Sequence, residues 1–94
     1  MERKPIIVAQ RLTELRESVH LSQAKLAAQF EGVEQSAIFR YENAQSFPPY
    51  WVLMQYADFF DVSLDYIFGR TDNPQGKLYG YQPKIILHST QMQE

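Results

Sequence analysis

Few side chains in this chain of 94 residues have the types and spacing that catalysis requires. There is no cysteine, which excludes thiolate nucleophiles, thiolate zinc sites and disulfides. His20 and His88 are isolated, without partners at metal-binding spacing. Asp58, Asp61 and Asp65 lie around a predicted helix end and the next helix start, where aspartate is common. We therefore expect a protein that is not an enzyme and that needs no metal, cofactor or small-molecule ligand.

A second group of side chains, in the segment Gln35–Tyr41, is suited to hydrogen bonding rather than to catalysis. The Gln35 amide can donate and accept at N6 and N7 of adenine, and Arg40 can donate to guanine or to a phosphate. The alternative is that both are ordinary surface residues, with Arg40 in an ion pair with Glu34 or with a neighbouring chain. Which interpretation holds depends on the helix that carries them.

Hydrophobic periodicity predicts five short helices that would position these side chains. They cover residues 7–18, 23–30 and 35–41, followed by a fourth helix that opens at Pro48-Pro49 and a fifth after Ser63. Ser22 and Ser63 are suited to cap helix N-termini, and Gly69 is suited to cap a C-terminus. The apolar residues expected to hold these helices together are Val8, Leu12, Leu15, Val19, Leu26, Ala27, Phe30, Val33, Ile38, Tyr41, Leu53, Ala57, Phe60, Leu64, Ile67 and Phe68.

Five short helices joined by short loops make an all-α domain. Two consecutive helices that share a tight turn, together with a helix that has a polar outer face, are typical of a helix-turn-helix that reads DNA. We place this domain in residues 1–76 and a C-terminal arm in residues 77–94. The arm has a short extended pattern, and one strand is expected around Lys84–His88.

The segment Leu21–Asn43 resembles the Cro-type, or XRE-type, helix-turn-helix family of phage repressors and bacterial regulators. The resemblance rests on Leu21-Ser22-Gln23, Leu26-Ala27, Gly32-Val33, Ile38 and Tyr41-Glu42-Asn43, and it continues through Pro48, Leu53, Ala57 and Val62–Pro74. It covers roughly residues 7–76. It implies a five-helix, lambda-repressor-like DNA-binding domain whose partner is double-stranded DNA.

Residue types agree with this resemblance at positions that shape the domain. Ala27 falls where the two helices approach closely, and Gly32 lies in the turn, where a positive φ is often required. Arg16 and Glu42 look like the internal ion pair of the family, and we assign them to structure. If that pair is buried, removal of one partner would leave an unpaired charge.

The resemblance implies that the outer face of the third helix enters the major groove of DNA. This interpretation assigns base contacts to Gln35 and Arg40. Ser36 could contact a base or a phosphate, or its hydroxyl could bond locally at the helix start. Phe39 could contact a thymine methyl group, contact a protein surface, or turn into the core.

Further polar residues flank this helix. Gln23, at the start of the second helix, is expected to contact the DNA backbone, as the matching glutamine does in the family. Asn43 and Gln45 could contact the sugar-phosphate backbone or be ordinary loop residues. Glu34 could accept a hydrogen bond from cytosine N4 or be a solvated helix end. The predicted DNA-binding set is therefore Gln23, Glu34, Gln35, Ser36, Phe39, Arg40, Asn43 and Gln45.

The turn between the second and third helices departs from the family pattern. The run Gln29–Gly32 makes this turn one residue longer than the common spacing. The extra residue bears on the angle between the two helices, and therefore on how the third helix docks on DNA.

The arm carries apolar side chains, including Tyr79, Tyr81 and Ile85–Leu87, that favour a homodimer. A lone strand is not stable by itself, so the arm must pack on its own domain or pair with a second copy. A DNA site read as two half-sites also needs a two-fold dimer. We expect the arm, with Tyr50 and Trp51, to help build that dimer.

The net charge of -2 argues, on its own, against a polyanion as the partner. Residues 1–56, however, hold six basic and six acidic side chains, so the predicted DNA-reading part is neutral. We therefore expect few phosphate contacts and a shallow dependence of affinity on salt. No apolar run is long enough to cross a bilayer and the N-terminus does not resemble a signal peptide, so we expect a cytoplasmic protein.

Two functional hypotheses follow from these observations. The first is a sequence-specific transcriptional regulator, most simply a repressor, that binds an inverted-repeat operator as a homodimer. The second is a protein-interaction module on the same fold, such as an antitoxin or a subunit that sequesters a regulator. Phe39, Glu34 and the apolar arm favour the second hypothesis, and failure to select any DNA from random oligonucleotides would support it.

Overall fold

The computed structural model describes residues 6–75, which form five α-helices. These are α1 (Ile6–Ser18), α2 (Gln23–Gln29), α3 (Gln35–Glu42), α4 (Tyr50–Phe60) and α5 (Leu64–Ile67). One isolated bridge, between Val62 and Gln75, is the extent of β-structure in this part of the chain. The predicted all-α fold is therefore confirmed here, whereas the arm and its expected strand at Lys84–His88 lie outside the described residues.

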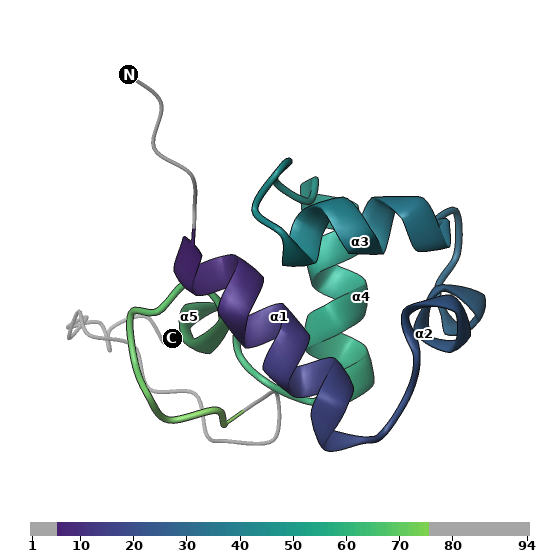
Figure 1. The fold of residues 1–94 in the computed structure, drawn as a ribbon. Coiled ribbons are helices and arrows are strands. Elements are labelled where there is room, and N and C mark those ends of the chain that lie inside the picture. The colour runs from purple at the N-terminus through teal and green to yellow at the C-terminus, as the bar shows by residue number, and fades with distance from the viewer. Residues whose placement is uncertain (1–5, 76–94) are drawn as a thin grey trace, which may run out of the picture.

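The helices pack so that α2 and α3 lie to one side of the domain and α5 lies to the other (Figure 1). α1 contacts both α3 and α5, while α2 contacts α3 and α4 contacts α5. The turn between α2 and α3 is thereby separated from the end of the described chain. Among residues 6–75, every helix is too short or too polar to cross a membrane.

The helix boundaries agree with the predicted caps. The Ser22 hydroxyl accepts a hydrogen bond from the Lys25 amide at 3.1 Å, and the Ser63 hydroxyl accepts one from the Tyr66 amide at 3.0 Å. These serines satisfy N–H groups that the first turn of a helix leaves without partners. Pro49 is the N-cap of α4, so this helix begins one residue later than the proline pair that predicted it.

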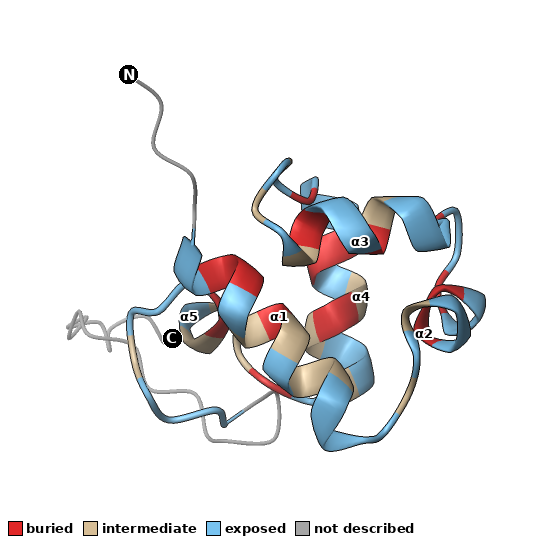
Figure 2. Cartoon of the chain, viewed as in Figure 1, coloured by how far each residue is buried: buried red, intermediate tan, exposed pale blue. Residues whose placement is uncertain are grey.

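The core is a single cluster formed by the inward faces of all five helices (Figure 2). Most of the predicted core residues are buried, and Leu15, Ala57, Phe60 and Leu64 pack against the cluster as partly buried side chains. The prediction of Val19 as a core residue is wrong, because α1 ends at Ser18 and Val19 is 44% exposed. Phe68 caps the end of α5 and is also exposed. Core positions that the periodicity did not predict are Ala9, Val52, Tyr56 and Val62.

Tyr56 contributes a polar group to the centre of this core. Its ring is fully buried and meets Phe30 edge-to-face, with ring centroids 5.0 Å apart. Within residues 6–75 its hydroxyl has no hydrogen-bond partner. Burial raises the pKa of Tyr56, and the nearby Glu42 carboxylate raises it further, so the phenol stays neutral.

Two glycines in the left-handed region should differ in how well they tolerate alanine. Gly32 has φ +71, and an added Cβ would meet the Trp51 ring at an ordinary 3.5 Å. Gly69 has φ +81, and an added Cβ would lie 2.7 Å from Cγ1 of Ile7. We expect Gly32→Ala to lower the free energy of unfolding by about 1–2 kcal/mol through backbone strain alone. Gly69→Ala should cost more, because overpacking adds about 1–3 kcal/mol.

Urea denaturation of both variants would measure this difference. Equal losses for Gly32→Ala and Gly69→Ala would contradict the tight approach of Gly69 to Ile7.

Candidate nucleic-acid interface

The third helix presents one apolar and one solvent-exposed face. Ile38 and Tyr41 point inward and are buried in the core. The predicted contact residues Gln35, Ser36, Phe39 and Arg40 are all exposed, so the structure brings these four side chains to one surface. The expected division of this helix into core and outer faces is therefore present.

Gln35 is held at the start of α3 by a side chain from α2. Its Nε2 donates a hydrogen bond to Oε1 of Gln23 at 3.2 Å. Gln23 in turn donates from Nε2 to Oε1 of Glu42 at 2.9 Å. Two of the predicted contact residues are thus joined to each other and to the interior of the domain.

The predicted pair between Arg16 and Glu42 is present and well shielded from solvent. Arg16 donates from Nε to Oε2 of Glu42 at 2.7 Å and from Nη2 to Oε1 at 2.9 Å. The Glu42 side chain is 3% exposed and that of Arg16 is 14% exposed. Arg16 also donates from Nη1 to the Leu21 carbonyl at 2.8 Å, which ties α1 to the segment before α2.

The electrostatics of this pair keep Arg16 charged. The hydrogen bond to Glu42 raises the pKa of Arg16, although burial opposes that increase. Because the guanidinium bonds to α3 and to the backbone before α2, it braces both helices of the motif against α1. The pair therefore has the structural role that the resemblance implied.

Arg40 and Phe39 are both available to a partner. Among the described residues Arg40 forms no salt bridge, so the suggested ion pair with Glu34 is not present there. The Phe39 side chain is 46% exposed, which rules out the suggestion that the longer turn rotates it into the core. Phe39 is therefore an exposed aromatic ring on an otherwise polar helix face.

Glu34 and Ser36 lie at the exposed start of α3. Glu34 occupies the N-cap position but makes no side-chain capping hydrogen bond. Among residues 6–75 the Ser36 hydroxyl makes no hydrogen bond, so the local bond suggested as its alternative role is not present there. Both side chains are exposed at the N-terminus of α3, which is the positive end of the helix dipole.

The two residues predicted just after α3 differ in their surroundings. Asn43 is the C-cap of α3, and its Nδ2 donates to the Phe39 carbonyl at 2.8 Å. Gln45 is exposed, and its backbone N–H donates to the Arg40 carbonyl at 2.9 Å. Asn43 therefore terminates the helix whatever else it contacts, while the Gln45 side chain faces solvent.

The long turn between α2 and α3 is fastened to α4. Phe30, the C-cap of α2, is buried and packs against the rings of Tyr56 and Phe59. The Gln55 side chain accepts from the Glu31 backbone N–H at 2.8 Å and donates to the Glu31 carbonyl at 3.0 Å. The extra residue is therefore part of a fixed turn whose shape depends on α4. Gln55 has no signal in the sequence that would identify this role.

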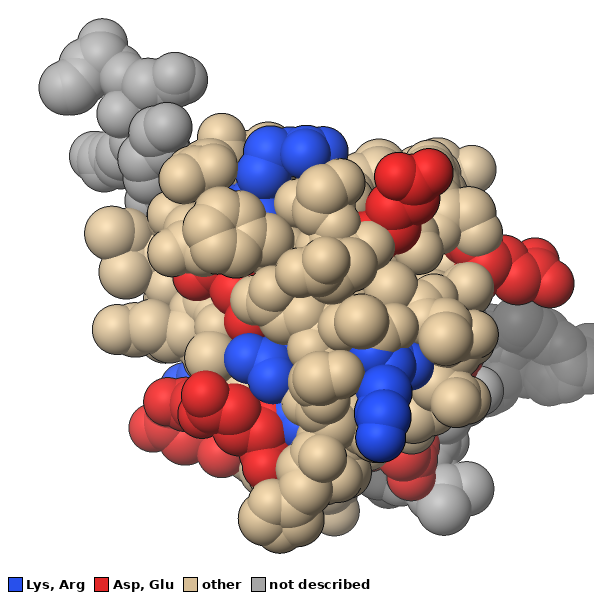
Figure 3. Space-filling view, turned by 45° about the vertical axis from the view of Figure 1, so that its right-hand side comes forward, with Lys and Arg blue, Asp and Glu red and all other residues tan. Residues whose placement is uncertain are grey.

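Charged side chains on one face of the molecule form small, separate groups. On the face in Figure 3, basic side chains lie at the centre and top and an acidic group lies at the lower left, and no broad basic area is visible. This agrees with the equal numbers of basic and acidic residues in the first part of the chain. This face supplies little of the general attraction to phosphate that basic DNA-binding proteins use.

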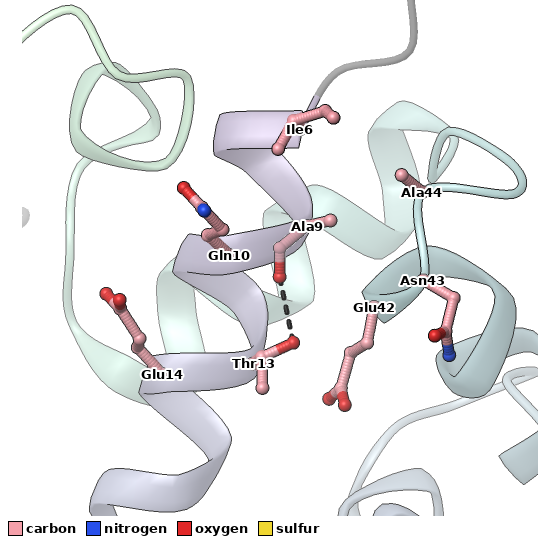
Figure 4. A pocket seen from close by; sticks show the side chains of 8 residues that line it. All are labelled: Ile6, Ala9, Gln10, Thr13, Glu14, Glu42, Asn43 and Ala44. Carbon is pink, nitrogen blue, oxygen red and sulfur yellow. Dashed lines mark hydrogen bonds between the residues drawn. The ribbon is translucent and has the colours of Figure 1, made fainter.

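A shallow depression lies between the start of α1 and the end of α3 (Figure 4). The Thr13 hydroxyl at its wall is already bonded to the Ala9 carbonyl at 2.9 Å, and the Glu42 carboxylate is bonded to Arg16 and Gln23. Throughout residues 6–75 there is no group of three or more metal-ligating side chains. The depression therefore has no side chains arranged for a metal ion. Its lining residues are Ile6, Ala9, Gln10, Thr13, Glu14, Glu42, Asn43 and Ala44.

Sequence comparisons identify the same segment. A family model described as Helix-turn-helix matches residues 12–67, which include α2, α3 and α4. Over 69 residues the chain is 39% identical to YobD of Bacillus subtilis (strain 168), named an uncharacterized HTH-type transcriptional regulator. The alignment covers 73% of this chain and 61% of that protein. No solved structure matches the chain significantly.

The family match spans more than half of the chain and contains the two helices and turn described above. The helical fold of this segment, and the exposed outer face of α3, are those of a DNA-binding motif. The chain therefore belongs to the XRE-type helix-turn-helix family of DNA-binding regulators.

Proposed function

We propose that the protein is a transcriptional repressor that binds an inverted-repeat DNA site as a homodimer, with α3 of each copy in the major groove. The exposed face of α3 carries this proposal, because Gln35 and Arg40 project from a helix that Ile38 and Tyr41 fix to the core. We place the protein in the cytoplasm, and DNA binding of this kind requires no cofactor.

Within this proposal, the exposed residues have distinct roles. Gln35 reads an adenine through N6 and N7, and Arg40 donates to a guanine or to a phosphate. Phe39 packs on a thymine methyl group. Gln23 contacts the DNA backbone near the N-terminus of α2. The supporting contacts come from Glu34, Ser36, Asn43 and Gln45.

The equal numbers of basic and acidic residues in residues 1–56, and the lack of a broad basic area on the face in Figure 3, support recognition through bases more than through phosphates. Each phosphate contact that releases a counterion contributes a slope of about -0.9 to the dependence of log affinity on log salt. A face without a broad basic area, such as the one in Figure 3, makes few such contacts. Specific binding is therefore expected to weaken only modestly as salt rises.

An exposed aromatic pair away from α3 supports the homodimer. Phe47, before α4, stacks on Phe68, after α5, with ring centroids 6.4 Å apart. Their side chains are 49% and 37% exposed, and Tyr50 at the start of α4 is 79% exposed. Contact with a second copy would remove this apolar surface from water. The C-terminal arm is proposed to complete that interface.

Deletion of Lys77–Glu94 should shift the protein from dimer towards monomer. The arm contributes apolar side chains to the proposed interface, whereas the described core ends before it. Sedimentation of the full and shortened chains over a range of concentrations would measure the change. Matching thermal unfolding at a concentration where both are monomeric is the control for folding. A dimer that persists unchanged would refute the role of the arm.

Selection of bound duplexes from a random library, at a stated salt concentration, is the test of the proposed function. The expected product is a two-fold symmetric sequence with a recurrent adenine in each half-site.

One observation favours a different function, a protein-interaction module. Phe39 is an exposed aromatic residue in the middle of the proposed DNA-reading face. If the library yields no enriched sequence, that face is better explained by a protein partner.

A further inference from the structure

A line of hydrogen bonds runs from the interior of the domain to the first side chain of α3. Arg16 donates to Glu42, Gln23 donates to Glu42, and Gln35 donates to Gln23. We call these four residues the amide relay. It begins at a side chain in α1 that is 14% exposed and ends at an exposed side chain on α3.

The chemistry of the buried end determines the direction of every bond in the relay. A guanidinium can only donate hydrogen bonds, and the carboxylate that it faces can only accept them. Gln23 must therefore turn its NH₂ group towards Glu42, which leaves its carbonyl oxygen on the other side. That oxygen accepts from Nε2 of Gln35, at 3.2 Å. Gln35 is left with its own carbonyl oxygen and one N–H for a partner outside the protein.

One acceptor and one donor side by side match the major-groove edge of adenine, which offers an N6–H donor and an N7 acceptor. Guanine offers only the acceptors N7 and O6 on that edge. If Gln23 were reversed, the Gln35 carbonyl would have to accept from it, and the donor and acceptor of the Gln35 amide would exchange places. The N–H of Gln35 would then face the position of N6 in adenine, which is also a donor, and of O6 in guanine, which is an acceptor, so the reversed amide would favour guanine over adenine. The orientation of Gln23 thus decides which purine Gln35 can read.

We propose that Glu42 is a positioning residue for base recognition, which selects adenine over guanine by orienting Gln23 and, through it, Gln35. The inference rests on the proposed function, because it assumes that Gln35 reads a base. It adds to that function a residue that never touches DNA, since the Glu42 side chain is 3% exposed. Burial matters here, because water cannot replace the carboxylate as the acceptor for Gln23.

The test compares duplexes that carry the selected sequence with each of the four base pairs at one position. Gln35→Ala first identifies the position, as the one where preference for adenine disappears. Glu42→Gln then keeps the shape of the side chain but allows Gln23 to adopt either orientation. We expect the preference of the unaltered protein for adenine over guanine, roughly tenfold or more, to fall towards equality in Glu42→Gln at that position only. Preferences at other positions should be unchanged.

A second variant keeps the test decisive if Glu42→Gln folds poorly. Gln23→Met preserves the buried ion pair and removes the oriented amide, so it should also reduce the preference for adenine. Gln29→Met, on an exposed glutamine of the same helix, is the matched control and should leave the preference intact.

Uniform weakening for all four bases in Glu42→Gln and Gln23→Met would overturn the relay and leave the proposed function standing. If Gln35→Ala changes the preference at no position, the assignment of base reading to Gln35 fails, and the relay fails with it.

Discussion

Replacement of Glu42 with alanine should lower the free energy of unfolding by about 3–5 kcal/mol, the range typical of removing one partner of a buried ion pair. The expectation follows from geometry, because Glu42 accepts two hydrogen bonds from Arg16 and one from Gln23 while it is 3% exposed. Its loss leaves the Arg16 guanidinium, which is 14% exposed, with only the exposed carboxylate of Glu17 at 4.0 Å as a counter-charge. Since small domains are stable by only about 5–15 kcal/mol, this single change removes a large part of the total.

Chemical denaturation measures this loss, and the chain provides a matched control. Arg70 and Asp65 form an ion pair at 3.2 Å, but their side chains are 74% and 55% exposed. Arg70→Ala should therefore cost no more than about 1 kcal/mol. The double variant Arg16→Met with Glu42→Leu should recover much of the loss, because it leaves no buried charge unpaired. A cost for Glu42→Ala as small as that for Arg70→Ala would contradict the structural role of the pair.

The sequence predicted those parts of the fold that depend on neighbouring residues. Ser22 and Ser63 cap the helices that follow them because a serine hydroxyl can reach an N–H within one turn. Ile38 and Tyr41 are buried because residues three apart share a helix face. The prediction that Val19 is a core residue was wrong because the apolar spacing continues past the end of α1. Beyond Ser18 the chain turns, and His20 adopts φ +60.

The candidate site was predictable in composition but not in its connections. The exposed face of α3 follows from the residues opposite its buried side, whereas residue types and spacing did not exclude a place in the core for Phe39. The bond between Gln23 and Glu42 joins residues on different helices and depends on the angle at which those helices meet. The two hydrogen bonds between the Gln55 side chain and the Glu31 backbone likewise depend on the path of the longer turn. Residue types and spacing do not determine such angles.

Replacement of both Gln35 and Arg40 with alanine should abolish specific DNA binding while leaving the fold intact. A good bidentate contact to a base contributes about 1–3 kcal/mol of discrimination, and the proposed homodimer would lose these contacts in both half-sites. Both side chains are exposed, and Gln35 is bonded to the partly exposed Gln23. Substitutions at such positions usually change stability by less than about 0.5 kcal/mol. Affinity for the selected duplex should thus fall to that for unrelated DNA, with an unchanged midpoint of thermal unfolding.

The matched control substitutes the same residue types elsewhere on the surface. Gln29 ends α2 and Arg70 follows α5, and both side chains are exposed outside the face that Gln35 and Arg40 share. Gln29→Ala with Arg70→Ala should bind the selected duplex like the unaltered protein at the same salt concentration, because it removes an equal number of polar groups without touching that face. If the Gln35 and Arg40 variant keeps its operator affinity, α3 does not read bases through these residues. If the control variant loses affinity equally, the DNA contacts extend beyond α3, because the loss then follows general surface polarity rather than the geometry of one helix.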